Sequence, residues 1–206
     1  MNSTFATNSV LRKSVLAVTG LVFAGGIAAG PIADSVTAPD TRPVAASVQV
    51  AQAGAEKPDT AKLMPHGTMG EQSRIGLNDE QVGNVKSIIA ATKKAGMDER
   101  AAVVSIATSL QESKLENLGH LGDRNDHDSQ GLFQQRPSSG WGTVEQITDA
   151  EYSTTAFLKG LKQVDGWQEM PLTYAAQAVQ VSAFPEAYAQ WETQAADLVA
   201  EHWTTS

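Results

Sequence analysis

The sequence predicts an all-α domain over residues 77–206, preceded by two segments without a core of their own. Two observations predict this class. Apolar residues recur with the 3.6-residue spacing of helices while strand-like alternation is almost absent, and Asn, Asp, Pro and Gly stand where helices begin or end. Upstream, residues 1–38 have the pattern of a signal peptide, and residues 39–76 have the composition of a flexible linker. We therefore expect one folded domain that follows an export signal and a tether.

The N-terminal segment has the three parts of an export signal. Arg12 and Lys13 supply positive charge, and the apolar run 14–29 follows them. Small residues then offer a cleavage site after Ala28 or after Ala38. A retained membrane anchor is the alternative, but glycines interrupt the run, which falls short of the roughly 20 apolar residues of a spanning helix. We expect cleavage and export from the cell.

The composition excludes several classes of protein. None of the 206 residues is Cys, which excludes disulfide scaffolds, thiol nucleophiles, cysteine-rich zinc sites and an acylated lipoprotein anchor. The formal net charge is −8, and the domain itself holds nine Lys or Arg against eighteen Asp or Glu. This charge argues against nucleic acid or anionic lipid as a partner. Residues 39–76 are charge-balanced and lack helical periodicity, so we expect them to be flexible.

Local signals predict the first two helices of the domain. Asn78 or Asp79 is expected to cap a helix that Gly96 ends. Asp98 is expected to cap the next helix, in which residues 101–110 contain no charged side chain. A helix that is small or apolar all round is a buried one, so we expect this helix to be central.

Later signals predict three more helices and one long loop. Asp149 is expected to cap a helix, and Pro171 and Pro185 each suit the first turn of another. The last helix is expected to run from Pro185 to Trp203. Residues 115–143 are rich in Gly, Asp, Asn, Ser and Gln, and a loop of this length in a small domain is usually functional or disordered.

Glu112 is the candidate catalytic residue. It stands at the C-terminal end of the expected buried helix, directly before the long loop, where a carboxylate can emerge from a packed helix into a cleft. Partial burial disfavours the charged form of a carboxyl group, as a general acid requires. Taken alone, a structural glutamate at an exposed helix end is the commoner interpretation.

Two blocks of the domain resemble the lysozyme-like superfamily, in particular bacterial lytic transglycosylases. Glu112-Ser113 matches the Glu-Ser that ends a helix in that family. Residues 131–134 (Gly-Leu-Phe-Gln) match its Gly-Leu-Met-Gln loop, with Pro137 at the family's nearby proline. The domain is also similar to secreted actinobacterial proteins with a late Ala-Phe-Pro-x-x-Tyr block, here residues 183–188. The resemblance implies a lysozyme-like fold and an exported cell-wall enzyme that cleaves glycan strands of peptidoglycan, as a lytic transglycosylase or a muramidase.

The candidate site follows from these blocks and from the chemistry of their side chains. Glu112 is expected to protonate the leaving oxygen and then to act as a base. Gly131 would let the loop backbone pass close to the catalytic helix, while Leu132 and Phe133 anchor the loop. An amide such as Gln134 can hydrogen-bond a sugar or the catalytic carboxyl group, and an aromatic ring can stack on a sugar. The expected substrate-binding residues are Ser113, Gly131, Leu132, Phe133, Gln134, Gln135, Trp141 and Tyr174.

One block departs from the family and leaves a second interpretation open. Where the family has Ala-x-Tyr-Asn-Ala-Gly, residues 174–180 read Tyr-Ala-Ala-Gln-Ala-Val-Gln. This difference favours a non-catalytic glycan-binding or cell-wall structural module on the same fold. Hydrolysis with two carboxylates would require a partner for Glu112 at roughly 5–9 Å. No spacing singles out one of the three candidates in the loop, so a single-acid mechanism fits better; these candidates are Asp123, Asp126 and Asp128.

A third and weaker interpretation is a secreted metal-binding protein. The pattern Asp126-x-Asp128 imitates the start of a calcium loop, but Pro137 stands where the bidentate glutamate should be. His120 and His127 are a poor pair for zinc. We expect solvated charges in this loop and neither a metal nor a cofactor. The expected partner is peptidoglycan, with no nucleic acid and no membrane after cleavage, and we expect a secreted or wall-located monomer.

Overall fold

The computed structural model describes residues 58–122 and 127–204. Within these two ranges every regular element is a helix, apart from one isolated antiparallel bridge between Gln130 and Gln135, so the all-α class is confirmed. The expected signal peptide and residues 39–57 of the expected linker lie outside the described residues. No helix in the described part of the chain is long and apolar enough to span a membrane.

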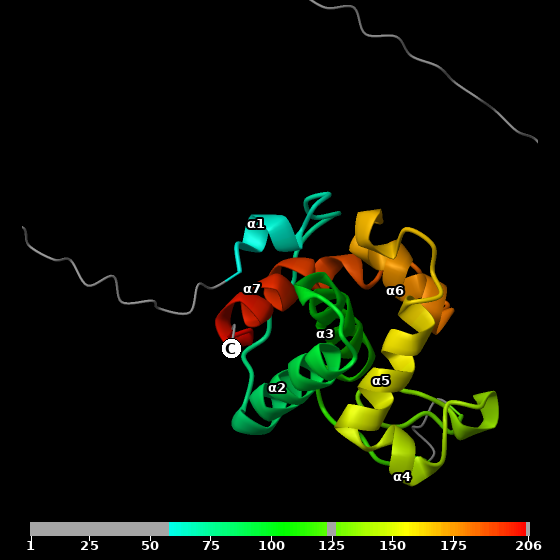
Figure 1. Ribbon diagram of the computed structural model, residues 1–206. Helices are drawn as coiled ribbons and strands as arrows, with labels where there is room; N and C mark the ends of the chain where they lie inside the picture. Colours follow the sequence, from blue (N-terminus) through cyan, green and yellow to red (C-terminus); the bar gives the residue numbers. More distant parts are fainter. Residues whose placement is uncertain (1–57, 123–126, 205–206) are drawn as a thin grey trace, which may run out of the picture. The chain divides into compact units, whose positions relative to one another are not determined.

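One helix lies at the centre of the fold. Figure 1 shows α3 in the middle with α2, α5, α6 and α7 around it, and the contacts between helices agree with this arrangement. The α-helices are α1 (Thr60–Leu63), α2 (Asp79–Lys94), α3 (Glu99–Ser113), α4 (Val144–Ile147), α5 (Ala150–Leu161), α6 (Leu172–Gln180) and α7 (Glu192–His202). Short 3-10 helices are η2 (Pro137–Ser139), η3 (Trp167–Glu169) and η4 (Ala189–Trp191).

The central helix α3 is buried as predicted. Every residue of the uncharged stretch 101–110 is buried, and Asp98 caps the helix by accepting a hydrogen bond from the Ala101 amide at 3.1 Å. Small side chains in this stretch let the neighbouring helices approach closely. Those neighbours contribute Ile88, Phe157, Leu172 and Val199 to the same core.

The predicted starts of α2 and α5 are confirmed by their caps. Asn78 forms a capping box with Gln81, in which the amide of each donates to the side chain of the other, at 2.8 and 2.9 Å. Asp149 accepts a hydrogen bond from the Tyr152 amide at 2.7 Å. Gly96 follows α2 with a φ of +65° and ends the helix as expected.

Residues 58–76 belong to the folded domain, so the expectation of a flexible linker up to residue 76 is wrong for this segment. Leu63 of α1 is buried in the core. The Gln72 side chain accepts a hydrogen bond from the Thr193 amide and donates one to the Ala189 carbonyl, both at 3.0 Å. Side-chain amides and one buried leucine hold the segment in place. Because these contacts do not repeat along a helix face, the sequence of the segment shows no helical periodicity.

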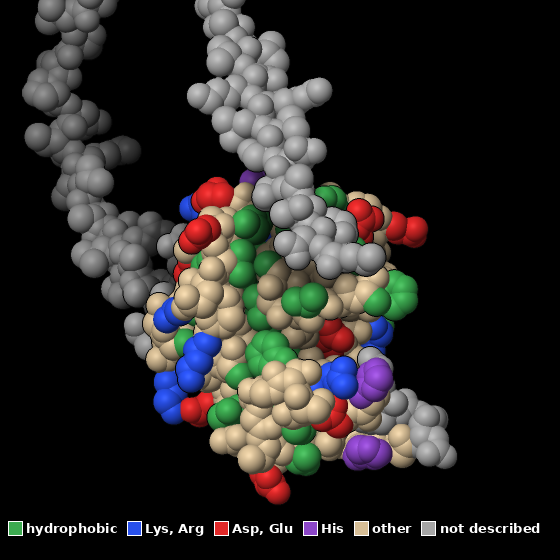
Figure 2. Space-filling view, turned by 90° about the vertical axis from the view of Figure 1, so that its right-hand side faces the viewer, with side chains coloured by type: hydrophobic (Ala, Val, Ile, Leu, Met, Phe, Trp, Pro, Cys, Tyr) green, Lys and Arg blue, Asp and Glu red, His purple; other side chains and the backbone are tan. Residues whose placement is uncertain are grey.

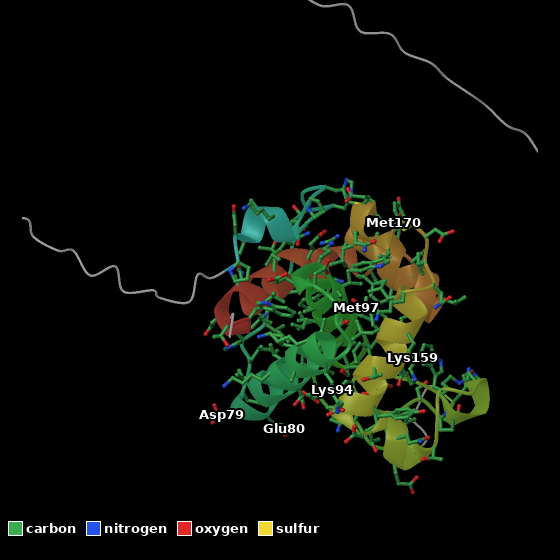
Figure 3. The ribbon with its side chains drawn as sticks, viewed as in Figure 1. Asp79, Glu80, Lys94, Met97, Lys159 and Met170 are labelled. Atoms are coloured by element: carbon green, nitrogen blue, oxygen red, sulfur yellow. The ribbon has the colours of Figure 1, made fainter. Side chains whose placement is uncertain are left out.

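A buried ion pair joins this segment to three others. Arg100 Nη1 donates to Glu192 Oε1 at 2.7 Å, and both side chains are more than nine-tenths buried. The same guanidinium group donates to the carbonyls of Leu63, at 2.8 Å, and Met170, at 3.3 Å. Met170 is labelled beside α6 in Figure 3. Because an unpaired buried charge costs about 3–5 kcal/mol, the pair holds α1, α3 and α7 in one arrangement.

The last helix begins later than predicted. Helix α7 starts at Glu192, whereas the sequence predicted a helix from Pro185. The segment between them forms turns and then η4, because the Thr173 hydroxyl donates to the Pro185 carbonyl at 2.6 Å and the Tyr188 side chain is buried in the core. These contacts, which join residues far apart in the sequence, override the local helix signal of the proline.

Candidate active site

A groove of about 750 Å³ opens beside the C-terminal end of α3. Four segments line it: the end of α3, the loop 129–141, the end of α6 and the loop 181–184. Figure 2 views the side of the molecule that carries α5 and α6, where hydrophobic side chains lie among polar ones. The lining residues are Gln111, Glu112, Ser129, Phe133, Gln134, Gln135, Arg136, Ser139, Trp141, Val179, Gln180, Val181, Ser182, Ala183 and Phe184.

Glu112 is the only carboxylate among the described residues that line the groove. It lies in the last turn of α3 and is half-buried. Its Oε1 atom accepts hydrogen bonds from the Tyr188 hydroxyl at 2.7 Å and from Gln180 Nε2 at 3.3 Å. Gln180 Nε2 also donates to the Phe133 carbonyl at 2.9 Å, so one amide links the carboxylate to the loop. Donors from two other segments therefore orient the carboxylate.

Two titratable neighbours of Glu112 have shifted pKa values. Burial raises the pKa of Tyr188, and the charge of Glu112 and the hydrogen bond to it raise it further. Tyr188 therefore stays protonated and donates across the physiological pH range. Burial lowers the pKa of Lys114, an effect that the charge of Glu112 partly opposes. The Lys114 ammonium group donates to the Leu110 carbonyl at 3.0 Å and lies 4.5 Å from the centre of the Trp191 ring.

The loop 130–135 is a tight turn that backbone hydrogen bonds close. The amides of Gln130 and Gln135 each donate to the other's carbonyl at 3.0 Å. Gly131 has a φ of +77°, and a Cβ atom there would lie 2.0 Å from the carbonyl oxygen of Ile147 at the end of α4. The sequence predicted a close approach at Gly131, but to the helix that carries the carboxylate. This expectation is corrected, because the backbone approaches α4.

Three of the expected substrate-binding residues position this loop and do not line the groove. Gly131 makes the turn, while Ser113 and Leu132 are buried, and the Ser113 hydroxyl donates to the Leu132 carbonyl at 2.8 Å. Phe133 lines the groove and also stacks on Phe157, with 5.0 Å between the ring centres. These contacts fasten the loop to α3 and α5, as the sequence predicted for Leu132 and Phe133.

The other expected residues are divided between the groove and the surface. Gln134, Gln135 and Trp141 line the groove. The Gln135 side chain is buried, and Gln134 and Trp141 are half-buried. Tyr174, on α6, is 47% exposed and does not line the groove, so the structure does not bring it to the candidate carboxylate.

Tyr188 and Gln180 hold the carboxylate, although the sequence analysis assigned neither of them this role. Gln180 makes the contact that was expected of Gln134, whose own amide donates to a carbonyl within its loop at 3.0 Å. Tyr188 belongs to the block 183–188, which the resemblance singled out without a role. Both residues are far from the carboxylate in the sequence, by 68 and 76 positions, so no local pattern relates them to it.

Two exposed apolar side chains form the rim of the groove beyond α6. Val181 is 79% exposed and Phe184 is 72% exposed, and both line the groove. Val181 has a φ of +51°, a conformation that is unusual for a β-branched residue. The rim therefore offers apolar surface to a ligand beside the polar floor of the groove.

Asp128, in the long loop between α3 and α4, holds two other residues of this loop through hydrogen bonds. Asp128 accepts hydrogen bonds from Arg136 Nε at 2.9 Å and from the amide and hydroxyl of Ser138 at 2.8 and 2.9 Å. These partners, Arg136 foremost, hold the pKa of Asp128 well below its usual range. In residues 58–122 and 127–204, no group of three His, Asp or Glu side chains is arranged to hold a metal ion. Asp123 and Asp126 lie outside the described residues.

Neither a protein-family model nor a curated protein matches this chain. The function is therefore inferred from the groove and from the resemblance of its blocks. A half-buried carboxylate in a groove, with amide and aromatic side chains around it, is an arrangement suited to acid–base chemistry on an uncharged polar substrate.

Proposed function

We propose that this chain is an exported cell-wall enzyme that cleaves the glycan strands of peptidoglycan, with Glu112 as its general acid and base. The position of Glu112 carries this proposal. The end of a buried helix delivers one carboxylate into a groove, and Tyr188 and Gln180 orient it. The lysozyme-like block at residues 131–134 packs beside the same carboxylate and supports the assignment.

A single carboxylate can carry both proton transfers. Protonated Glu112 donates its proton to the glycosidic oxygen while the bond from this oxygen to the anomeric carbon breaks, and the leaving sugar departs as an alcohol. The carboxylate then removes a proton from the water molecule or the sugar hydroxyl group that attacks the anomeric carbon. Water as the attacking group gives hydrolysis, and a hydroxyl of the same sugar gives an anhydro product. The Tyr188 hydroxyl stabilises the carboxylate between the two steps through its 2.7 Å hydrogen bond.

A mechanism with two carboxylates has less support. It would need a second carboxylate across the substrate from Glu112. Asp128 does not line the groove, and its oxygens are bonded to Arg136 and Ser138. The single-acid mechanism therefore fits the described residues better.

Apart from Arg136, which is paired with Asp128, the remaining lining suits a neutral, polyhydroxylated substrate. The amides of Gln134 and Gln180 offer donors and acceptors to hydroxyl groups. The rings of Trp141 and Phe184 offer faces on which sugars can stack. A volume of about 750 Å³ also lies within the usual range of ligand sites.

A non-catalytic glycan-binding module on the same fold is the second candidate. The exposed ring of Phe184 at the rim favours it, because stacking on a sugar needs no acid. The two candidates differ in one property. Only the enzyme requires Glu112 to exchange a proton.

The test compares the clearing of purified cell walls by the wild type, Glu112→Gln and Glu116→Gln. Glu112→Gln keeps the size and the hydrogen-bonding capacity of the side chain but cannot deliver a proton, so we expect the rate to fall about 10²–10⁴-fold. Glu116 is exposed and does not line the groove, so the control should keep the wild-type rate. Equal rates for all three would contradict the proposal. Glycan binding without clearing by the wild type would support the binding module instead.

A further inference from the structure

A second hollow, of about 270 Å³, adjoins the groove at Trp141. Trp141 lines both cavities. In Figure 3, Lys159 lies on the side of α5 that is nearer to the loop around η2. Gly140 and Trp141 form one wall of the hollow. The other wall is one face of α5, whose residues stand at positions i, i+3, i+4 and i+7. These residues are Tyr152, Thr155, Ala156 and Lys159.

Contacts within the chain hold both walls of the hollow. The bonds of Asp128 to Ser138 fasten η2, which ends two residues before Trp141 in the chain. On the other side of Trp141, a Cβ atom at Gly142 would lie 2.9 Å from a ring carbon of Tyr152. The backbone at Gly142 therefore packs directly on the Tyr152 ring. Trp141 thus lies between two segments that contacts hold in place, η2 before it and Gly142 after it. The hollow has a defined shape.

Lys159 gives the hollow a chemical preference. Its side chain is exposed, and the ion pairs of the described residues all involve other side chains. The domain holds twice as many acidic as basic residues, so a cation beside the groove creates a local site for a carboxylate. The hydroxyl groups of Tyr152 and Thr155 add hydrogen-bond donors on the same helix face. An acidic peptide fits this combination better than a neutral sugar does.

We infer that the hollow binds the acidic peptide branch that peptidoglycan strands carry, while the groove binds the strand itself. The inference rests on the proposed function, because it takes the groove as the glycan site. A sugar in contact with Trp141 brings its substituent to the adjoining cavity, where a carboxylate of the peptide pairs with Lys159. The protein then selects strands that carry acidic peptides over bare glycan.

Calorimetry on the full mature chain tests this selection. The Glu112→Gln substitution keeps the probes intact, and three probes are compared: a short glycan without peptide, the same glycan with its acidic peptide, and that molecule with its peptide carboxylates amidated. We expect the acidic-peptide probe to bind about three- to fivefold more tightly than the other two, which is the upper part of the range for one exposed ion pair. The preference should shrink as salt is added.

Substitutions at two lysines test whether Lys159 causes the preference for the acidic peptide. Lys159→Gln should lose the preference and keep its affinity for bare glycan, while Lys86→Gln, an exposed lysine that lines neither cavity, should keep both. Equal binding of all three probes, or a preference that survives Lys159→Gln, would overturn the peptide site and leave the proposed function standing. Binding of the free acidic peptide without any binding of bare glycan would support the hollow as a peptide site and overturn the proposed function.

Discussion

Tyr188 lies buried beside Glu112, and its hydroxyl group donates to the carboxylate at 2.7 Å. Its pKa is raised by burial first and by Glu112 second, so the hydroxyl keeps its proton across the physiological pH range. Tyr188 is therefore a positioning residue for the carboxylate.

The substitution Tyr188→Phe tests this role. We expect the rate of wall cleavage to fall about tenfold to hundredfold, because a hydrogen bond to a charged group is lost. The charged form of Glu112 becomes less favourable without its donor, so the loss of activity at high pH should move to higher pH. Tyr174→Phe is the matched control, since that tyrosine does not line the groove. An unchanged rate and pH profile in Tyr188→Phe would contradict the role.

Gly131 is a position where a side chain cannot be accommodated. Its φ is +77°, and a Cβ atom would overlap the Ile147 carbonyl oxygen at 2.0 Å. We expect Gly131→Ala to lower the free energy of unfolding by about 2–5 kcal/mol, from backbone strain and overpacking together. Gly140 has a similar φ of +82° with no atom within 4 Å, so Gly140→Ala isolates the strain and should cost less. Equal denaturation midpoints for the two variants would show that the turn relaxes around the new methyl group.

At the scale of elements, the helices with local start signals were predictable. Asn78, Asp98 and Asp149 each bond an amide three residues ahead, so the signal and the structure lie within one helical turn. The short helix α1 and the late start of α7 were not predictable in this way. They depend on contacts such as that of Leu63 with Arg100, which are 37 residues apart.

In the candidate site, too, the features with local sequence signals were predictable and those that depend on contacts between distant residues were not. Glu112 and the turn 131–134 lie in local blocks, and the sequence identified them with the correct helix end and loop. Gln180 and Tyr188 come from other segments and reach the carboxylate only through the packing of α6 and the turns before α7 on α3. The resemblance to local motifs therefore identified the candidate acid but assigned no role to the two residues that orient it.

Truncation tests the corrected boundary of the domain. A chain that begins at Gly70 lacks α1, and we expect it to melt several degrees below a chain that begins at residue 58. Burial of Leu63 contributes about 1.5–3 kcal/mol, and Arg100 loses a carbonyl acceptor. Leu63→Ala should reproduce part of this loss, whereas Lys62→Ala, at an exposed position, should not. Equal melting midpoints for the two chains would contradict the corrected boundary and support a flexible linker up to residue 76.

At the scale of the whole molecule, the fold places one carboxylate in a groove lined mainly by amides, apolar side chains and small polar groups. The central helix α3 is buried by four neighbours, and its last turn is the part that reaches the groove. The acidity of the domain, with eighteen acidic and nine basic residues, lies mostly outside this groove. Apart from Glu112 and Arg136, which is paired with Asp128, the lining residues are uncharged, and such a lining suits a sugar polymer better than a polyanion.

Mass spectrometry of the fragments released from purified peptidoglycan tests the central claim most directly, because it identifies the bond that is cut. We expect the wild type to release fragments cut at glycosidic bonds, and Glu112→Gln to release about 10²–10⁴-fold less in the same time while melting at a similar temperature. Release of the same glycan fragments at an equal rate by Glu112→Gln, or of fragments cut only at peptide bonds by the wild type, would contradict the claim.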